Sequence, residues 1–312
     1  LQNIVSEQLI GEGFNEILNN SLTREAYYSA LKTHAPEHLV HLLNPLSSDL
    51  NVMRQTLLFG GLESIAHNVN RKEGNLRFFE FGNCYVYDAE KRNAEKVLAP
   101  YSEELHLGLW LTGKRVMDSW AHANEDSSIY ELKGYAMNVL SRLGVPLGGL
   151  LIKEGTNDIF SKSLSVEDRN GKVCLELGLV SKALLVACDV EQEVYYADFN
   201  WSVLMKKLPK KEVSYTELSK FPAVRRDLAL LLDVSVPFAE VERVARACEK
   251  KLLRKVELFD VYEGDRLPEG KKSYAVAFTL SDETKTMNDK QTEAIMSKII
   301  KQLQQQLGAE LR

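Results

Sequence analysis

The sequence has few of the features that characterise membrane, secreted and zinc-ribbon proteins. No apolar run approaches the roughly 18 residues that a membrane-spanning helix needs. The four cysteines, Cys84, Cys174, Cys188 and Cys248, include no Cys-x-x-Cys pair, so neither a disulfide framework nor a zinc ribbon is indicated. A basic segment followed by an apolar core is missing from the start of the chain, which argues against a signal peptide. We expect a cytoplasmic protein and, because the chain starts with Leu1, a fragment of a longer one.

Sequence motifs for common catalytic chemistry are also missing. The nearest approach to a phosphate-binding loop, at Gly264 and Gly270, has its glycines one residue too far apart. Neither H-E-x-x-H nor G-x-S-x-G occurs. His34, His38 and His41 have helical spacing, but a proline interrupts them, and a zinc site needs a fourth ligand. The sequence therefore predicts no catalytic residue and no metal site.

Charge is unevenly distributed along the chain. With 44 Asp and Glu against 39 Lys and Arg, the net charge is −5, which argues against bulk electrostatic binding to nucleic acid. From Leu218 to Arg312 there are 17 Lys and Arg and 15 Asp and Glu, a net charge of +2, which leaves −7 for the remainder. A small basic region on an acidic chain predicts a local contact with a polyanion.

The pattern divides the chain into two domains, as expected for 312 residues. Residues 206–211 combine four lysines with a proline, which indicates a linker, and we predict domains at 1–208 and 209–312. In the first, strands with interspersed helices indicate an α+β fold with an antiparallel sheet. In the second, the predicted order βαββαβ is that of a ferredoxin-like domain. Its predicted strands cover 224–233, 256–263, 274–280 and 309–312.

The segment Arg-Phe-Phe-Glu at 77–80 is close to a motif of class II aminoacyl-tRNA synthetases. In that motif an Arg lies two residues before the Glu and binds the α-phosphate of ATP through bidentate hydrogen bonds. Here Phe78 has that position, and Arg77 comes one residue too early. On a strand, a shift of one residue turns the side chain to the opposite face. A later Gly-x-Gly-x-Gly-x-Glu-Arg segment, which would supply a second Arg for ATP, is also missing. The segment thus resembles part of a class II synthetase core whose catalytic groups are missing.

Further segments resemble the C-terminal part of the β subunit of bacterial phenylalanyl-tRNA synthetase, and the resemblance covers essentially the whole chain. The segment at 219–229 and the chain ending are the most specific. The similar segments are Leu-Asn-Pro-Leu-Ser at 43–47, Met-Arg-Gln-Thr-Leu-Leu at 53–58, Phe-Glu-Phe-Gly at 79–82, Ser-Lys-Phe-Pro-Ala-Val-Arg-Arg-Asp-Leu-Ala at 219–229 and Gly-Ala-Glu-Leu-Arg at 308–312.

This resemblance implies a non-catalytic, class II synthetase-like domain followed by a ferredoxin-fold anticodon-binding domain. In the family, the α subunit holds the active site and uses ATP and Mg²⁺ to attach phenylalanine to tRNA(Phe). Two α and two β subunits form an (αβ)2 heterotetramer. The chain would then support α-subunit association and tRNA binding, without a cofactor of its own and without DNA or membrane partners. The family's editing module and N-terminal tRNA-binding module lie upstream of the segment that Leu1 begins.

Apolar residues at spacings of three and four predict a helix over residues 54–71. A glycine pair in its middle costs roughly 1 kcal/mol per residue relative to alanine, which implies close approach by another backbone. We interpret this helix as a subunit interface. The alternative is that its apolar stripe packs on the domain's own sheet. The predicted interface residues are Arg54, Leu58, Gly60, Gly61, Ile65 and Asn68.

One face of the sheet in the second domain should pack on two helices and leave the other face free to meet RNA. Strand alternation places Arg225 and Asp227 on the free face, where the small Ala275, Ala277 and Thr279 leave room for a flat base. Phe259 and Tyr262 are expected on opposite faces, so at most one of them could stack on a base. The predicted tRNA-binding residues are Lys220, Arg225, Asp227, Lys272 and Thr279, with Lys220, Arg225 and Lys272 as phosphate ligands.

Two rival functions remain at this point. A ferredoxin-like fold serves many purposes, so the chain could be a stand-alone RNA-binding or regulatory module. Copurification with an α subunit would distinguish this case. A catalytically active class II enzyme is the second rival. The displaced Arg77 argues against it, and ATP–pyrophosphate exchange by the isolated chain would support it.

Overall fold

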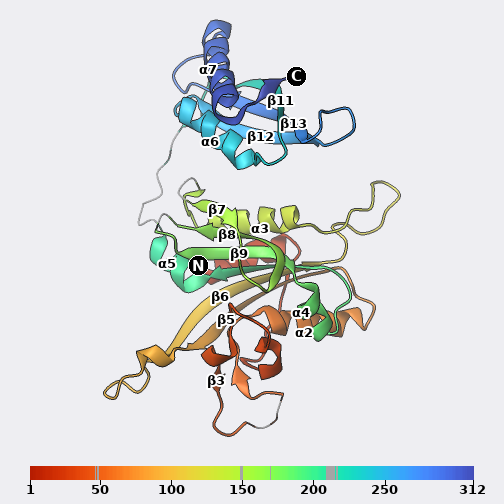
Figure 1. Ribbon diagram of the computed structural model, residues 1–312, viewed down its shortest axis with the longest axis vertical. Coiled ribbons are helices and arrows are strands. Elements are labelled where there is room, and N and C mark those ends of the chain that lie inside the picture. Colours follow the sequence, from red (N-terminus) through yellow and green to blue (C-terminus); the bar gives the residue numbers. More distant parts are fainter. Residues whose placement is uncertain (46, 48, 148–149, 169, 209–214, 216) are drawn as a thin grey trace. The chain divides into compact units, whose positions relative to one another are not determined.

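The computed structural model describes residues 1–45, 47, 49–147, 150–168, 170–208, 215 and 217–312. The chain divides into two compact units, unit 1 (Leu1–Lys211) and unit 2 (Glu212–Arg312), shown in Figure 1. The division lies close to the boundary predicted at 208/209. Pro209–Lys211 of the predicted linker and Leu46 of the family-like segment at 43–47 lie outside the described residues. Among the described residues, no helix is long and apolar enough to cross a membrane.

Unit 1 is built on a seven-stranded sheet in the order β1-β5-β6-β10-β9-β8-β7. All neighbouring strands are antiparallel except β1, which runs parallel to β5. The bounds are β1 (Asn15–Glu16), β5 (Leu76–Tyr87), β6 (Tyr101–Thr112), β7 (Leu151–Glu154), β8 (Phe160–Glu167), β9 (Val173–Val180) and β10 (Val194–Asn200). This confirms the predicted antiparallel α+β fold.

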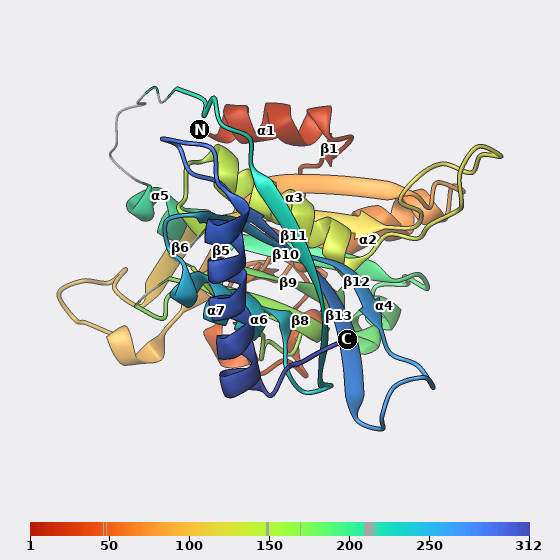
Figure 2. The same cartoon turned by 90° about the horizontal axis from the view of Figure 1, so that it is seen from above.

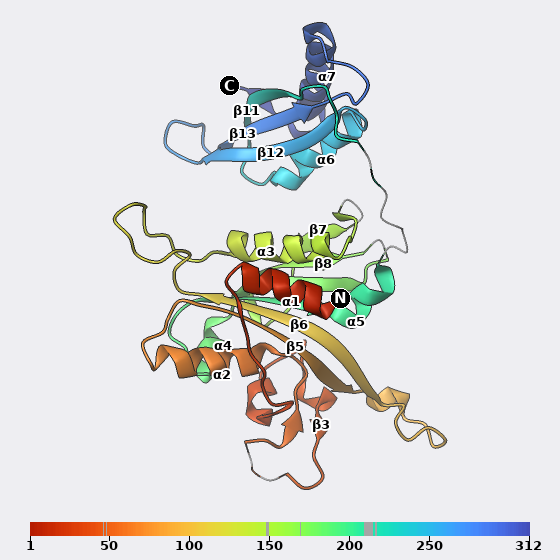
Figure 3. The same ribbon diagram turned by 180° about the vertical axis from the view of Figure 1, so that it is seen from behind.

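Both faces of this sheet are covered. Helices α1 (Gln2–Gly11), α3 (Ile129–Arg142) and α5 (Trp201–Lys207) pack on one face, which we call the α3 face. Helices α2 (Leu58–Val69) and α4 (Lys182–Ala187) pack on the opposite face, which we call the α2 face. Figure 3 shows α1 and α3 on one side of the sheet and α2 and α4 on the other. A small sheet and two short 3₁₀ helices complete the α2 face, namely β2 (Leu22–Thr23), β3 (Val40–His41), β4 (Val52–Met53), η1 (Glu25–Tyr28) and η2 (Pro36–His38).

Helix α2 is shorter than the helix predicted over 54–71. It begins at Leu58 and ends at Val69, so Arg54 lies before it and not on it. Its apolar stripe is buried in unit 1, with Leu58, Leu62 and Ile65 all 0% exposed. The stripe therefore packs on the chain's own sheet, which was the alternative interpretation of this segment.

Unit 2 has the predicted βαββαβ order. Its sheet runs β12-β13-β11-β14, and all pairs are antiparallel. The elements are β11 (Val224–Asp233), α6 (Phe238–Cys248), β12 (Leu253–Tyr262), β13 (Lys271–Leu280), α7 (Asp289–Leu307) and β14 (Glu310–Leu311). Figure 2 shows α7 lying across the strands of this sheet. The Asn288 side chain accepts a hydrogen bond from the Gln291 amide at 2.8 Å, which starts α7. Gly308, with φ 62°, ends it.

The two helices cover one face of the unit 2 sheet. Val241, Val244, Ile299 and Leu303 pack there against even-numbered residues of β11 and β13, such as Leu230. The odd-numbered residues of these two strands lie on the other face, which none of the helices described in unit 2 covers. We call this second face the open face.

Candidate nucleic-acid interface

The synthetase-like segment of unit 1 places Arg77 and Glu80 on opposite faces of β5. Arg77 lies on the α3 face, where its guanidinium donates to the Glu12 carbonyl and to the Glu131 carboxylate, both at 3.1 Å. Glu80 lies on the α2 face, fully buried, and accepts a hydrogen bond from Arg54 at 2.7 Å. The arrangement is the one predicted from strand alternation, and it leaves Arg77 and Glu80 unable to face the same bound ligand.

Large aromatic side chains fill the α2 face beside Glu80. Trp110 and Tyr196 are both 0% exposed, and their ring centroids lie 5.1 Å apart. Gly61 of α2 and Gly108 of β6 make room for the Trp110 ring, because a Cβ atom at either position would lie 2.1 Å or 2.5 Å from it. Packed aromatic rings therefore occupy this part of the sheet, and its residues do not fit a nucleotide.

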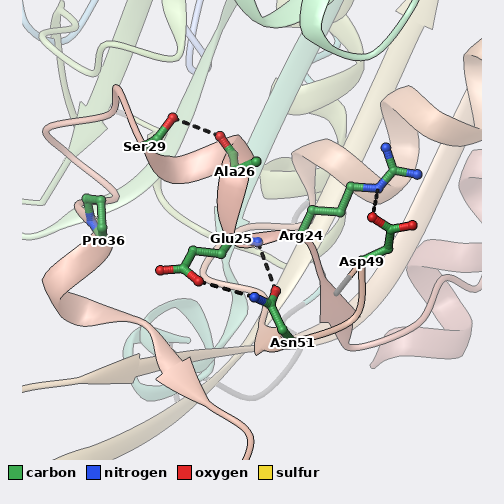
Figure 4. A pocket seen from close by; sticks show the side chains of 7 residues that line it. All are labelled: Arg24, Glu25, Ala26, Ser29, Pro36, Asp49 and Asn51. Carbon is green, nitrogen blue, oxygen red and sulfur yellow. Dashed lines mark hydrogen bonds and ion pairs between the residues drawn. The ribbon is translucent and has the colours of Figure 1, made fainter. Parts of the chain in front are cut away.

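A hollow of about 520 Å³ in unit 1 lies among η1, η2 and the segment before β4. Figure 4 shows that its polar side chains pair with one another. Arg24 and Asp49 form an ion pair at 3.9 Å, and the Asn51 side chain donates to Glu25 at 3.1 Å. These exposed pairs already satisfy one another, so the hollow presents no convergent group for catalysis.

A second polar pair on the α2 face consists of His106 and Asp198. The His106 Nδ1 atom lies 2.7 Å from Asp198 Oδ1, and both side chains are largely buried. Burial by itself would lower the pKa of His106. The negative charge and hydrogen bond of Asp198, together with the charge of Glu104, outweigh burial and raise the pKa of His106. Burial also lowers the pKa of nearby His34, which favours its neutral form.

This pair predicts a pH-dependent contribution to stability. A raised pKa in the folded state stabilises the protein below the ordinary value of 6.5, and the gain is lost as pH rises through the folded pKa. We expect His106→Gln to lower the free energy of unfolding more at about pH 6 than at about pH 9. Urea unfolding of both proteins at the two pH values measures this. An equal or larger loss at the higher pH would contradict the assignment.

The predicted interface residues lie mostly inside unit 1. Arg54, Leu58, Gly61 and Ile65 are buried, and the Asn68 side chain donates to the Ser64 carbonyl at 2.8 Å. Side chains of the same chain fill the space that the two glycines leave. Trp110 lies over Gly61, and the Asn19 side chain would be 2.9 Å from a Cβ at Gly60. The side of the two glycines that faces the sheet is therefore filled by the chain itself, and the subunit contact predicted for this helix stays a prediction.

The open face of unit 2 carries charged and small side chains in rows across three strands. Arg225, Thr279 and Lys255 are in register across β11, β13 and β12. The next row consists of Asp227, Ala277 and Glu257. Arg225 donates to Asp227 at 2.9 Å, and both side chains are at least half exposed. Three of the predicted tRNA-binding residues, Arg225, Asp227 and Thr279, therefore share this face, and Lys220 is exposed just before β11.

Lys272, by contrast, lies on the helix-covered face and not on the open one. It is 6% exposed, its ammonium donates to the Val234 carbonyl at 2.8 Å, and it lies 4.6 Å from the centroid of Tyr274. The even number of Lys272 puts it on the same face as the core residue Tyr274. The prediction of Lys272 as a phosphate ligand is corrected accordingly.

Two aromatic rings occupy the open face, where at most one was expected. The register of β12 shifts between Leu258 and Asp260, and this bulge changes which residues point to the open face. Phe259 lies under Arg225, 5.3 Å from its guanidinium carbon. Tyr262 pairs with Ser273 and lies 6.0 Å from the guanidinium of Arg312. Phe259 is 54% exposed and Tyr262 38% exposed, so both rings are available for stacking.

Comparison with known proteins agrees with this arrangement. Residues 1–201 match the family model described as "Phenylalanyl tRNA synthetase beta chain CLM domain". The chain belongs to this family. Residues 219–312 match the "Ferredoxin-fold anticodon binding domain", so the open face of unit 2 lies on that domain.

Curated relatives of this chain are named phenylalanine–tRNA ligase beta subunit. The protein of Bacteroides thetaiotaomicron is 62% identical over 312 residues and that of Porphyromonas gingivalis 53% identical over 311 residues. Each match covers 100% of this chain and 38% of the relative, so the chain spans well under half of their length. The solved structure of a pyrrolysyl tRNA synthetase of Desulfitobacterium hafniense is 14% identical in sequence and superposes with a TM-score of 0.48. The match covers 65% of this chain and 66% of the pyrrolysyl tRNA synthetase chain.

Sequence reasoning about this chain missed Lys255 and Arg312 and gave the wrong face to one aromatic ring. The β12 bulge has no signal in the sequence, because no Gly or Pro marks it. Arg312 reaches Tyr262 only because β14 pairs with β11 and its backbone donates to the Ala229 carbonyl at 3.0 Å. The burial of Lys272 could have been foreseen from strand alternation alone.

Proposed function

We propose that this chain is a non-catalytic part of phenylalanine–tRNA ligase, whose complete enzyme attaches phenylalanine to tRNA(Phe) with ATP. The names of the curated relatives support this proposal. We infer the tRNA-binding role of the chain from the open face of unit 2. There Phe259 and Tyr262 lie exposed beside Arg225 and Arg312. Exposed rings next to guanidinium groups can stack on unpaired bases and meet phosphates.

Catalysis in this proposal takes place on another subunit. Arg77 and Glu80 lie on opposite faces of β5, and Trp110 fills the space beside Glu80. These residues do not fit ATP, so ATP and Mg²⁺ are used at the active site of the α subunit. Among the described residues, no group of three or more His, Cys, Asp or Glu side chains could hold a metal ion. The chain would act in the cytoplasm, where tRNA is charged.

We further propose that unit 1 associates with the α subunit in an (αβ)2 heterotetramer. The buried stripe of α2 is not available for this contact. Helix α1 offers an apolar surface instead, because Ile4 is 39% exposed and Ile10 56% exposed while Val5 and Leu9 face the core.

The open face predicts the effect of removing its two rings. Phe259→Ala and Tyr262→Ala should each weaken binding of tRNA(Phe) to the complete enzyme by about tenfold, since stacking contributes roughly 1–3 kcal/mol per base. Filter binding at fixed salt measures the dissociation constants. Val261→Ala is the matched control, because Val261 lies on the same strand but pairs with Tyr274 of the covered face. If both aromatic variants bind like the control, the open face does not bind RNA.

A further inference from the structure

A dense group of cations lies at one end of the unit 2 sheet. Residues 250–255 contain four cations and no acid. The segment joins α6 to β12, so its cations lie where β12 begins and β13 ends. We call this group, together with one lysine of α7, the basic end. Its members are Lys250, Lys251, Arg254, Lys255 and Lys298.

Specific contacts hold these cations together. The Glu249 carboxylate accepts hydrogen bonds from the backbone amides of Lys251 and Leu252, at 2.9 Å and 3.0 Å, and thereby fixes the turn that carries the two lysines. Those bonds lower the pKa of Glu249. Lys298 of α7 donates to the Cys248 carbonyl at the end of α6, at 2.7 Å. Residues 250–255 and Lys298 of α7, which are separate in the sequence, thus bring positive charge to one place.

The cations of the basic end are available to an outside anion. Lys250 and Lys251 are exposed, and neither forms an ion pair with another described residue. Arg254 pairs with Glu283 at 2.8 Å and Lys255 with Glu257, but all four side chains are 42–65% exposed. Exposed pairs of this kind contribute only about 0–1 kcal/mol, so a phosphate group can replace the carboxylate at little cost.

The basic end is continuous with the open face. Lys255 is in register with Thr279 and Arg225, and Phe259 lies four residues further along the same strand. At about 3.4 Å per residue this separation is roughly 13 Å, a distance that a few nucleotides can bridge. An RNA strand whose bases stack on the open face can therefore continue across Lys255 toward Lys250 and Lys251.

We propose that the basic end binds the sugar–phosphate backbone of the tRNA whose unpaired bases occupy the open face. The inference rests on the proposed function and adds a second contact surface to it. Lysine ammonium groups are point charges that contact phosphates without reading sequence. The basic end would therefore add affinity and orientation for any tRNA, and the open face would supply selectivity.

The test uses the full-length β parent assembled with its α subunit, carrying Lys250→Gln and Lys251→Gln together. Binding of tRNA(Phe) and of a non-cognate tRNA is measured at several salt concentrations. Each lost phosphate contact lowers the slope of log K against log salt by about 0.7–0.9, so we expect a fall of about 1.5. Affinity at low salt should drop roughly five- to tenfold for both tRNAs, because the contact is independent of sequence.

A charge-matched control separates this effect from the loss of net charge. Arg243→Gln with Lys301→Gln removes two charges from exposed positions of α6 and α7, and it should leave slope and affinity unchanged. Thermal melting checks that both double variants fold. If the Lys250/Lys251 variant binds like this control while the wild type binds tRNA(Phe), the basic end has no RNA contact. If the wild type fails to bind tRNA(Phe), the proposed function itself falls.

Discussion

Replacing Gly61 with alanine should lower the free energy of unfolding of unit 1 by about 3 kcal/mol, as expected for severe overpacking. In an exposed helix the same change raises helix stability by up to about 1 kcal/mol. Here the added Cβ would lie 2.1 Å from Trp110 Cε2. Trp110 is 0% exposed and packs against Tyr196, so the ring has no free space to enter. Urea unfolding of the chain measures the change.

A second glycine provides the control for this prediction. Gly134 lies in α3, and a Cβ there would meet nothing within 4 Å. Gly134→Ala should therefore be neutral or stabilise by about 0.5–1 kcal/mol. Adding Trp110→Leu to Gly61→Ala should give a loss smaller than the sum of the two single losses, since the changed groups touch. A stable Gly61→Ala protein would show that α2 does not lie against Trp110.

Removing the positive partner of Glu80 should have a comparably large effect. Glu80 is 0% exposed, and Arg54 donates to it at 2.7 Å. Arg54→Met would leave a buried carboxylate whose remaining partner is Asn19, with a side-chain contact of 2.8 Å. Breaking one side of a buried ion pair typically costs about 3–5 kcal/mol. We expect that loss in the free energy of unfolding, measured by urea or thermal denaturation.

The exposed pair Arg24–Asp49 is the matched control for this variant. Its side chains are 49% and 70% exposed, so Arg24→Met should change stability by less than about 1 kcal/mol. Neutralising the acid as well, with Arg54→Met and Glu80→Gln together, should recover part of the loss, because no uncompensated charge stays buried. If Arg54→Met is as mild as Arg24→Met, Glu80 is not a buried ion in solution.

The sequence-based expectations succeeded where local periodicity decides the structure. Strand alternation placed Arg77 and Glu80 on opposite faces of β5, and the order of periodic segments predicted the βαββαβ topology of unit 2. Strand alternation, applied to Lys272, would also have placed that residue on the covered face and not on the open face. These features depend only on neighbours within one element.

Expectations about contacts between distant elements were less successful. The glycine pair of α2 correctly indicates a close approach, but nothing in the sequence identifies the group that approaches. Trp110 takes that place because β6 happens to pass beneath α2. The bulge that brings Tyr262 to the open face beside Phe259 depends on how β12 pairs with β13, and pairing is a property of the whole sheet. Such features arise from tertiary packing and not from local pattern.

The most direct test of the central claim is charging of tRNA(Phe) by the α subunit together with the full-length parent of this chain, either intact or truncated after Leu208. Size-exclusion chromatography first establishes that both forms assemble with the α subunit. The account predicts that truncation preserves assembly and abolishes charging at limiting tRNA, because the open face of unit 2 is lost. Equal charging by the truncated and intact forms would contradict the tRNA-binding role, and absence of charging with the intact parent would contradict the proposed function as a whole.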